Sequence, residues 1–149
     1  MLTSPRTRLG VLSAALAAWG LGTALGGQSS DWPQWRGPNR DGVSHESGWL
    51  TAWPADGPRV LWRASVGAGF SSVAIADGRV YTLGNQSGTD FAYCLDAATG
   101  RVVWQHSYPC CQGSYRGPRA TPTVSGGLVY TLSREGDLFC FRAATGEMV

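Results

Sequence analysis

The sequence predicts an all-β fold, a partial β-propeller of about two four-stranded blades plus one orphan closing strand. Three observations predict it: a segment that occurs twice, short strand-sized runs bounded by turn residues, and a composition rich in glycine and tryptophan. The 149 residues include 21 glycines and 7 tryptophans, and only 15% of them are charged. Glycine-rich turns combined with many aromatic residues are typical of all-β domains.

Residues 1–27 differ from the rest of the chain and are typical of a secretory signal peptide. Arg6 and Arg8 form a short basic start, residues 9–25 are mostly apolar, and small residues follow before the chain turns polar. This order is typical of a cleaved signal. A retained anchor is the alternative, but the apolar run is interrupted by glycines and is short against the ~20 residues of a span. We therefore expect a periplasmic or secreted domain at residues 28–149, with no membrane span after signal removal.

Two segments of this domain repeat each other. Residues 80–83, with the sequence VYTL, recur at residues 129–132, and residues 97–100, AATG, recur at 143–146. The offset between the copies drops by three residues between these two matches. We attribute the difference to a longer middle loop, residues 84–90, in the first copy, because loops tolerate changes in length. The two segments are therefore copies of one unit.

Each copy contains strand-sized runs separated by turns. Asp77-Gly78 predicts a tight hairpin within residues 72–84, and Gly126-Gly127 predicts the same turn in the second copy. Residues 91–96 alternate with a period of two, as a β-strand does. A Thr-Gly turn then leads into residues 102–104. One copy is therefore a meander of about four short strands.

Tryptophan marks the length of the repeat. Trp62 and Trp104 are 42 residues apart. Trp104 follows the last residue of its AATG segment by four positions, and the same spacing in the second copy would place a tryptophan immediately after Val149. A period in the low forties with four strands matches a propeller blade. Residues 60–64 end like a repeat but have nothing repeat-like before them, so we interpret them as the closing strand, with neighbours beyond residue 149. Two blades fall short of the about four to eight of a closed ring, which predicts a fragment.

Three motifs resemble those of the quinoprotein (pyrroloquinoline quinone-like) β-propeller repeat family. Residues 95–104, LDAATGRVVW, resemble the family's tryptophan-docking motif, in which glycine makes the turn and the indole lies against the next blade. Residues 31–42, DWPQWRGPNRDG, resemble the mature start of exported bacterial members, and residues 119–124, RATPTV, resemble their second-blade entry strand. The resemblance covers residues 31–149. It departs from the family pattern at Arg142, where aspartate is usual, and in the missing last tryptophan.

The resemblance also implies a candidate cofactor site. Quinoprotein alcohol dehydrogenases carry a vicinal cysteine pair over their quinone, with arginine and glycine a few residues on. Here this implies quinone contacts at Cys110, Cys111, Arg116 and Arg119. A bond between Cys110 and Cys111 would be strained, because adjacent α-carbons lie only ~3.8 Å apart. The intervening QGSY stretch departs from the family, and we favour two surface-loop thiols over a cofactor role.

The other two cysteines, Cys94 and Cys140, occupy equivalent positions in the two copies. Packed sheets lie ~10 Å apart, too far for the ~5.5–6 Å α-carbon spacing of a disulfide. We therefore predict two separate, buried thiols that act as small apolar residues. His45 and His106 have no ligand partner nearby in the sequence, so we assign neither of them a catalytic role.

Charge and motifs bound the function. The formal net charge is +2, and all 12 basic residues are scattered arginines, so a nucleic-acid or anionic-membrane surface is not expected. The sequence matches no nucleotide-loop, zinc-protease or calcium-loop motif. We favour a non-catalytic scaffold or binding module that contacts other envelope proteins, since the same repeats build an outer-membrane-protein assembly scaffold. The alternative is a quinone- and Ca²⁺-dependent, alcohol dehydrogenase-like enzyme whose catalytic blades lie beyond residue 149.

Overall fold

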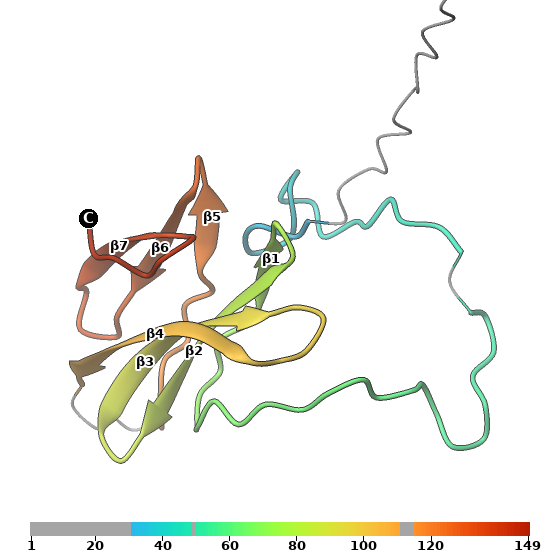
Figure 1. Cartoon of the computed structure of the whole chain (residues 1–149), viewed down its shortest axis with the longest axis horizontal. Helices are drawn as coiled ribbons and strands as arrows, with labels where there is room; N and C mark the ends of the chain where they lie inside the picture. The colour runs from blue at the N-terminus through green and yellow to red at the C-terminus, as the bar shows by residue number, and fades with distance from the viewer. Residues whose placement is uncertain (1–30, 49, 111–114) are drawn as a thin grey trace, which may run out of the picture.

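The computed structural model describes residues 31–48, 50–110 and 115–149, in which seven strands form two antiparallel sheets (Figure 1). The first sheet has the order β1-β2-β3-β4, with β1 at Ala74–Ala76, β2 at Arg79–Gln86, β3 at Thr89–Asp96 and β4 at Val102–Pro109. The second has the order β5-β6-β7, with β5 at Thr123–Ser125, β6 at Leu128–Leu132 and β7 at Leu138–Arg142. The described residues contain no helix. The all-β, partial-propeller prediction is confirmed.

The hairpins form where the sequence predicts them. Asp77 and Gly78 between β1 and β2 have φ of 51° and 69°, and Gly126 and Gly127 between β5 and β6 have 57° and 74°. Two successive residues in the left-handed region make the tight turn that suits twisted antiparallel strands. The repeat therefore has the same first hairpin in both copies.

The predicted long loop at residues 84–90 is wrong. β2 continues to Gln86 and β3 begins at Thr89, so only Ser87 and Gly88 connect them. Asn85 holds this end together, because its Nδ2 donates to Asp90 Oδ1 at 2.6 Å and its Oδ1 accepts from the Gly88 amide at 3.2 Å. The first copy therefore differs from the second by longer strands rather than by a longer loop.

The second sheet has three strands, one fewer than the repeat predicts. Met148 forms a single bridge with Phe141, and the Val149 amide donates to the Cys140 carbonyl at 2.8 Å. These contacts start a fourth strand in the place that β4 takes in the first sheet. Residues 60–64 belong to neither sheet, and their role as a closing strand stays a prediction. Figure 1 shows the chain approaching them as an extended segment outside the sheets.

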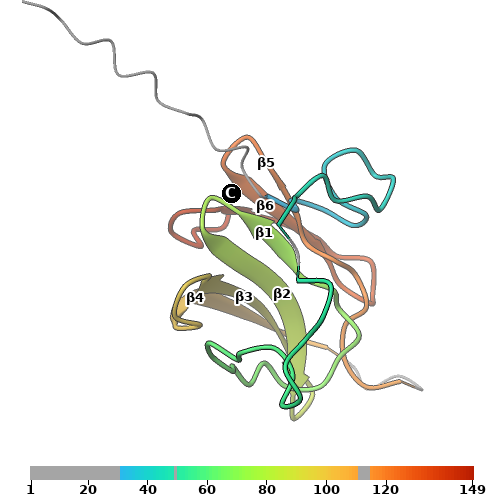
Figure 2. The same ribbon diagram turned by 90° about the vertical axis from the view of Figure 1, so that its right-hand side faces the viewer.

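The main core lies between the two sheets, which pack side by side (Figures 1 and 2). Trp104 of β4 lies at its centre, with ring centroids 6.0 Å from Tyr81 and 5.7 Å from Phe141. Cys94 is fully buried in this core, whereas Cys140 is half-buried, and neither forms a disulfide. The prediction of separate thiols is therefore confirmed, but that of a buried Cys140 is wrong because its side of the second sheet has no described neighbour.

Each tryptophan of the repeat docks on the Thr-Gly turn of the sheet that follows it. Trp62 Nε1 donates to the Ala97 carbonyl and Trp104 Nε1 to the Ala143 carbonyl, both at 2.9 Å. The glycines of these turns, Gly100 and Gly146, have φ of 71° and 74° and lie directly against the indole rings. A side chain there would meet the ring, so glycine supplies both the turn and the flat docking surface.

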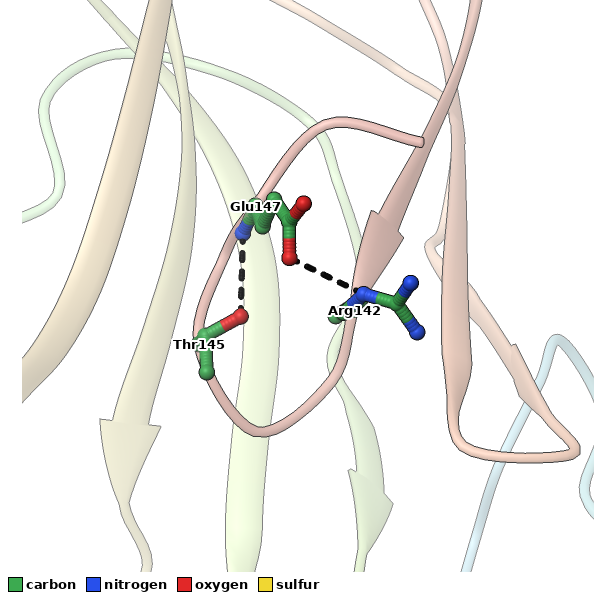
Figure 3. Close-up of polar contacts among 3 residues, drawn as sticks. All are labelled: Arg142, Thr145 and Glu147. Carbon is green, nitrogen blue, oxygen red and sulfur yellow. Dashed lines mark hydrogen bonds and ion pairs between the residues drawn. The ribbon is translucent and has the colours of Figure 1, made fainter.

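The departure at Arg142 changes how the second turn is held. In the first turn, Asp96 Oδ1 accepts from the Thr99 amide at 2.9 Å and from the Thr99 hydroxyl at 2.7 Å. In the second turn, Arg142 Nε pairs with Glu147 Oε2 at 2.9 Å, and the Glu147 amide donates to Thr145 Oγ1 at 3.3 Å (Figure 3). An exposed ion pair thus replaces a side-chain cap, and exposed pairs contribute only about 0–1 kcal/mol.

The segment at residues 31–42 joins the two sheets at their first strands. Trp32 exchanges two backbone hydrogen bonds with Ile75 of β1, at 2.8 and 2.9 Å. The next residue, Pro33, accepts a hydrogen bond from the Val124 amide of β5 at 2.8 Å. This motif therefore bridges the edges of both sheets, which the sequence did not predict.

The buried tyrosines predict loss of stability at alkaline pH. Burial is the main cause that raises the pKa values of Tyr81, Tyr93 and Tyr108, and it also raises those of the Cys94 and Cys110 thiols. The neutral forms are therefore favoured in the folded state. Their contribution is complete below the unfolded pKa values, about 9 for cysteine and 10 for tyrosine, and declines as pH rises through the higher folded values.

We expect the contribution of these groups to the free energy of unfolding to stay constant from pH 7 to about 9 and to fall at higher pH. Urea titrations followed by circular dichroism between pH 7 and 11 measure this. The variant Tyr81→Phe should show a smaller decline than the original chain. Equal slopes in the two proteins would contradict the assignment of the effect to Tyr81.

Candidate functional site

A cavity of about 380 Å³ lies beside the β2–β3 hairpin. Small-ligand pockets in proteins start at about 300 Å³, so the cavity is large enough for a side chain or a small molecule. Polar groups dominate its wall. Its lining residues are Ala68, Asn85, Ser87, Gly88, Arg116, Gly117 and Arg134.

Close backbone contacts hold the wall of this cavity together. Ala68 and Asn85 exchange two backbone hydrogen bonds at 2.9 and 2.7 Å, which ties residues 67–69 to the end of β2. Gly117, with φ of 79°, lies against the Ala68 carbonyl so closely that no side chain fits between them. The position therefore requires glycine, and this close contact holds the segment that begins at Tyr115 against the wall of the cavity.

Arg134 crosses from the second sheet to the first. It sits in the turn between β6 and β7, its Nη1 donates to the Tyr115 carbonyl at 2.7 Å, and its Nη2 donates to Cys110 Sγ at 3.4 Å. Guanidinium groups carry several donors in a fixed plane, so one side chain can satisfy two partners on a neighbouring segment. Arg134 thus fixes the chain on both sides of residues 111–114 to the wall of the cavity.

Cys110 lies directly beneath this arginine, just after β4. Its side chain is buried, and its amide donates to the Gly88 carbonyl at 3.2 Å. Burial raises the pKa of the thiol, and the neighbouring Asp90 charge raises it further, whereas the bond from Arg134 lowers it. The net direction is upward. Because the thiolate is the reactive form, the thiol of Cys110 is a weak nucleophile at neutral pH.

Asp90 supplies a buried carboxylate next to the cavity. It is fully buried in β3 and accepts the short hydrogen bond from Asn85 described above. It pairs across the sheet with Tyr108 of β4, and its charge adds to burial in raising the pKa of Tyr108. A buried carboxylate is stable only with such polar neighbours. Asp90 therefore stabilises the end of the β2–β3 hairpin through its hydrogen bond with Asn85.

The structure separates the predicted site residues. Cys110 and Arg116 come together at the cavity, since Arg116 lines it and Cys110 contacts the lining residue Arg134. Arg119 is exposed and lies over the Tyr115 ring, with its Cζ 4.6 Å from the ring centroid, outside the lining. Cys111 lies outside the described residues. The expectation for the pair Cys110–Cys111 therefore stays a prediction.

Sequence reasoning missed three residues of the site: Asn85, Asp90 and Arg134. Asp90 carried a signal, because a charged residue inside an apolar strand run is unusual unless it has a partner. Arg134 carried none, since it lies 24 residues after Cys110 on a different sheet. Only the packing of the two sheets brings its guanidinium onto the thiol.

The described lining contains two arginines and no acidic residue, which suits an anionic ligand such as a carboxylate. Within the described ranges, no group of three or more His, Cys, Asp or Glu side chains could hold a metal ion. A planar quinone carboxylate could pair with Arg116, but the described lining offers it no aromatic face. The arrangement fits a carboxylate better than a flat aromatic cofactor.

Two adjacent sheets, a docking tryptophan in each repeat and a cavity at their loop end define a β-propeller repeat protein. The model of the family described as outer membrane protein assembly factor BamB matches residues 46–149. The chain belongs to this family, and the predicted quinoprotein-like repeat is confirmed.

The chain is also similar to a solved structure. BamB from Moraxella catarrhalis is similar over 62% of this chain, with a TM-score of 0.41 and 26% sequence identity. The similar region is 28% of that protein, so this chain spans under a third of its length. A search of curated proteins finds no match.

In the part of the chain that the structure describes, no helix combines the length and hydropathy that crossing a membrane requires. The predicted signal peptide lies outside the described residues.

Proposed function

We propose that this chain is part of an exported, non-catalytic scaffold in the bacterial cell envelope, and that its cavity binds an acidic segment of a partner protein. The observation that carries the proposal is that Arg116 and Arg134 both line a cavity whose described lining has no carboxylate. Two guanidinium groups facing one cavity can bind carboxylates through charge-assisted hydrogen bonds.

The reactive groups near the cavity favour binding over catalysis. The thiol of Cys110 has a raised pKa and is covered by Arg134, and the carboxylate of Asp90 is fully buried. A general base or nucleophile must reach its substrate and have a pKa near the working pH. Family membership supports a scaffold as well, because the matching family is described as an assembly factor.

A peptide-binding measurement tests the cavity. The probe is a blocked tetraglutamate peptide, titrated into the chain by calorimetry at low salt. Replacing Arg116→Met should weaken binding by about tenfold, since a charge-assisted contact is lost. Arg119→Met is the matched control, because this substitution removes the same charge at a residue that does not line the cavity. Equal weakening by both variants would show a general charge effect and contradict the cavity assignment.

Two further measurements address location and the enzyme alternative. Expression of the whole chain in a bacterium, followed by fractionation and intact mass, should give a periplasmic product that lacks about the first 27 residues. When pyrroloquinoline quinone and Ca²⁺ are added to the chain, the absorbance spectrum of the quinone should stay equal to that of free quinone. A shifted spectrum that Arg116→Met abolishes would replace the scaffold with the quinoprotein dehydrogenase alternative.

A further inference from the structure

Two exposed aromatic side chains lie next to the cavity. Phe70 is 63% and Tyr115 is 59% exposed. Their ring centroids lie 6.4 Å apart, with the two ring planes at 81° to each other. This edge-to-face geometry is one that aromatic pairs favour. We call the pair of Phe70 and Tyr115 the aromatic rim.

The path of the chain places the aromatic rim at the wall of the cavity. Phe70 follows the lining residue Ala68 by two positions, and Tyr115 directly precedes the lining residue Arg116. Two residues of chain span at most ~7 Å, so both rings start close to the lining. The Phe70 amide donates to the Pro118 carbonyl at 2.8 Å, which holds the two segments side by side. A ligand side chain in the cavity therefore has the rim within reach of its neighbouring residues.

Two arginines hold Tyr115 in this position. Arg134, which lines the cavity, donates from Nη1 to the Tyr115 carbonyl at 2.7 Å. The Cζ of Arg119 lies 4.6 Å from the centroid of the Tyr115 ring, where the electrons of the ring face attract the cation. The backbone and the ring of Tyr115 are thus both fixed before a ligand arrives, and a preformed contact surface lowers the entropic cost of binding.

The aromatic rim lies at the junction between the two sheets. Residues 70–71, just before β1, run beside residues 118–120, just before β5, because the Ser71 hydroxyl donates to the Ala120 carbonyl at 2.8 Å. The rim therefore joins the same two segments whose residues line the cavity. An apolar surface and a positively charged cavity lie together at this junction.

We propose that the partner segment bound at the cavity carries an aromatic side chain among its acidic residues, and that this side chain packs on the aromatic rim. The inference rests on the proposed function, because an acidic residue bound by Arg116 and Arg134 sets where its neighbours lie. Arg119 adds positive charge beside the rim, which favours acidic residues next to the aromatic one. Burial of the aromatic ring supplies an apolar contribution that salt does not screen.

Two peptides that differ at one position test the aromatic rim. Blocked Glu-Glu-Phe-Glu-Glu and blocked Glu-Glu-Ala-Glu-Glu carry the same charge and place glutamates on both sides of the variable residue. In calorimetric titrations, the phenylalanine peptide should bind the original chain about five- to tenfold more tightly, as expected for partial burial of one ring. Phe70→Ser should remove this gain and leave the affinity for the alanine peptide unchanged.

Trp35→Ser is the matched control, because Trp35 is also exposed, at 64%, but lies far from the cavity. Its segment, residues 31–42, pairs with Ile75 of β1, which lies opposite Val80 near the start of β2. Figure 2 shows this segment and the β2–β3 hairpin at opposite ends of the first sheet. Trp35→Ser should therefore keep the full gain for the phenylalanine peptide. Circular dichroism spectra of both variants should equal that of the original chain, since both side chains are exposed.

The outcomes separate this inference from the proposed function. Equal affinities for the two peptides, both weakened by Arg116→Met, would overturn the role of the aromatic rim and leave the acidic-segment site standing. Absence of binding by both peptides would overturn both proposals. A gain that survives Phe70→Ser, or one that Trp35→Ser also removes, would overturn the role of the rim alone.

Discussion

Replacing Trp104→Ala should lower the free energy of unfolding by about 3–5 kcal/mol, the usual loss for a large buried aromatic residue. Trp104 is 8% exposed, packs between Tyr81 and Phe141, and donates to the Ala143 carbonyl. The variant therefore loses core contacts and leaves a carbonyl of the next turn without its donor. Whole domains are stable by only about 5–15 kcal/mol, so much of the stability of this two-sheet unit should disappear.

Urea unfolding followed by circular dichroism measures this loss without using tryptophan fluorescence. Trp35→Ala is the matched control, because Trp35 is 64% exposed and should contribute less than about 0.5 kcal/mol. Trp62→Ala should fall between the two, since Trp62 is half-buried but makes the same kind of hydrogen bond. Equal unfolding midpoints for the Trp104 and Trp35 variants would contradict the docking role of the indole.

Gly146→Ala should lower the free energy of unfolding by about 2–4 kcal/mol, through backbone strain and a steric clash together. Gly146 has φ of 74°, and an added Cβ would lie 2.6–2.9 Å from three atoms of the Trp104 indole. The ring cannot move away easily because its Nε1 is bonded to Ala143. The turn and the indole should therefore be disturbed together.

Gly126→Ala separates the strain from the clash. Gly126 also has a positive φ, of 57°, but no atom lies within 4 Å of an added Cβ. Its substitution should cost only the backbone term, about 1–2 kcal/mol. In the double variant with Trp104→Ala, the effect of Gly146→Ala should shrink toward this value, because the clash is gone. Full additivity in the double variant would rule out contact between the turn and the ring.

The repeat predicted much of the fold because its signals are local. The turn at Asp77-Gly78 needs only two residues that tolerate positive φ, and the period-two alternation of residues 91–96 needs only a sheet with two faces. The length of the β2–β3 connection was predicted wrongly although a local turn signal was present. Ser87 and Gly88 make a two-residue turn with φ of 52° and 84°, and the side-chain bond between Asn85 and Asp90 joins the strand ends beside it.

The candidate site was predicted less completely, since its parts come from distant segments. Cys110 and Arg116 were found through a resemblance in the chain between the repeats, and both lie at the cavity. Arg119 belonged to the same prediction, but its guanidinium stacks on Tyr115 instead. Side-chain direction over a few residues depends on the loop path, which short-range patterns do not specify.

Thus the order of the amino acids alone was enough to predict the blades and their first hairpins, because each depends on backbone preferences within a few residues. Two features required the packed sheets: the reach of Arg134 to Cys110, and the bridge from Trp32 and Pro33 to two first strands. Each joins residues whose separation in sequence carries no information about their distance in space until the sheets pack.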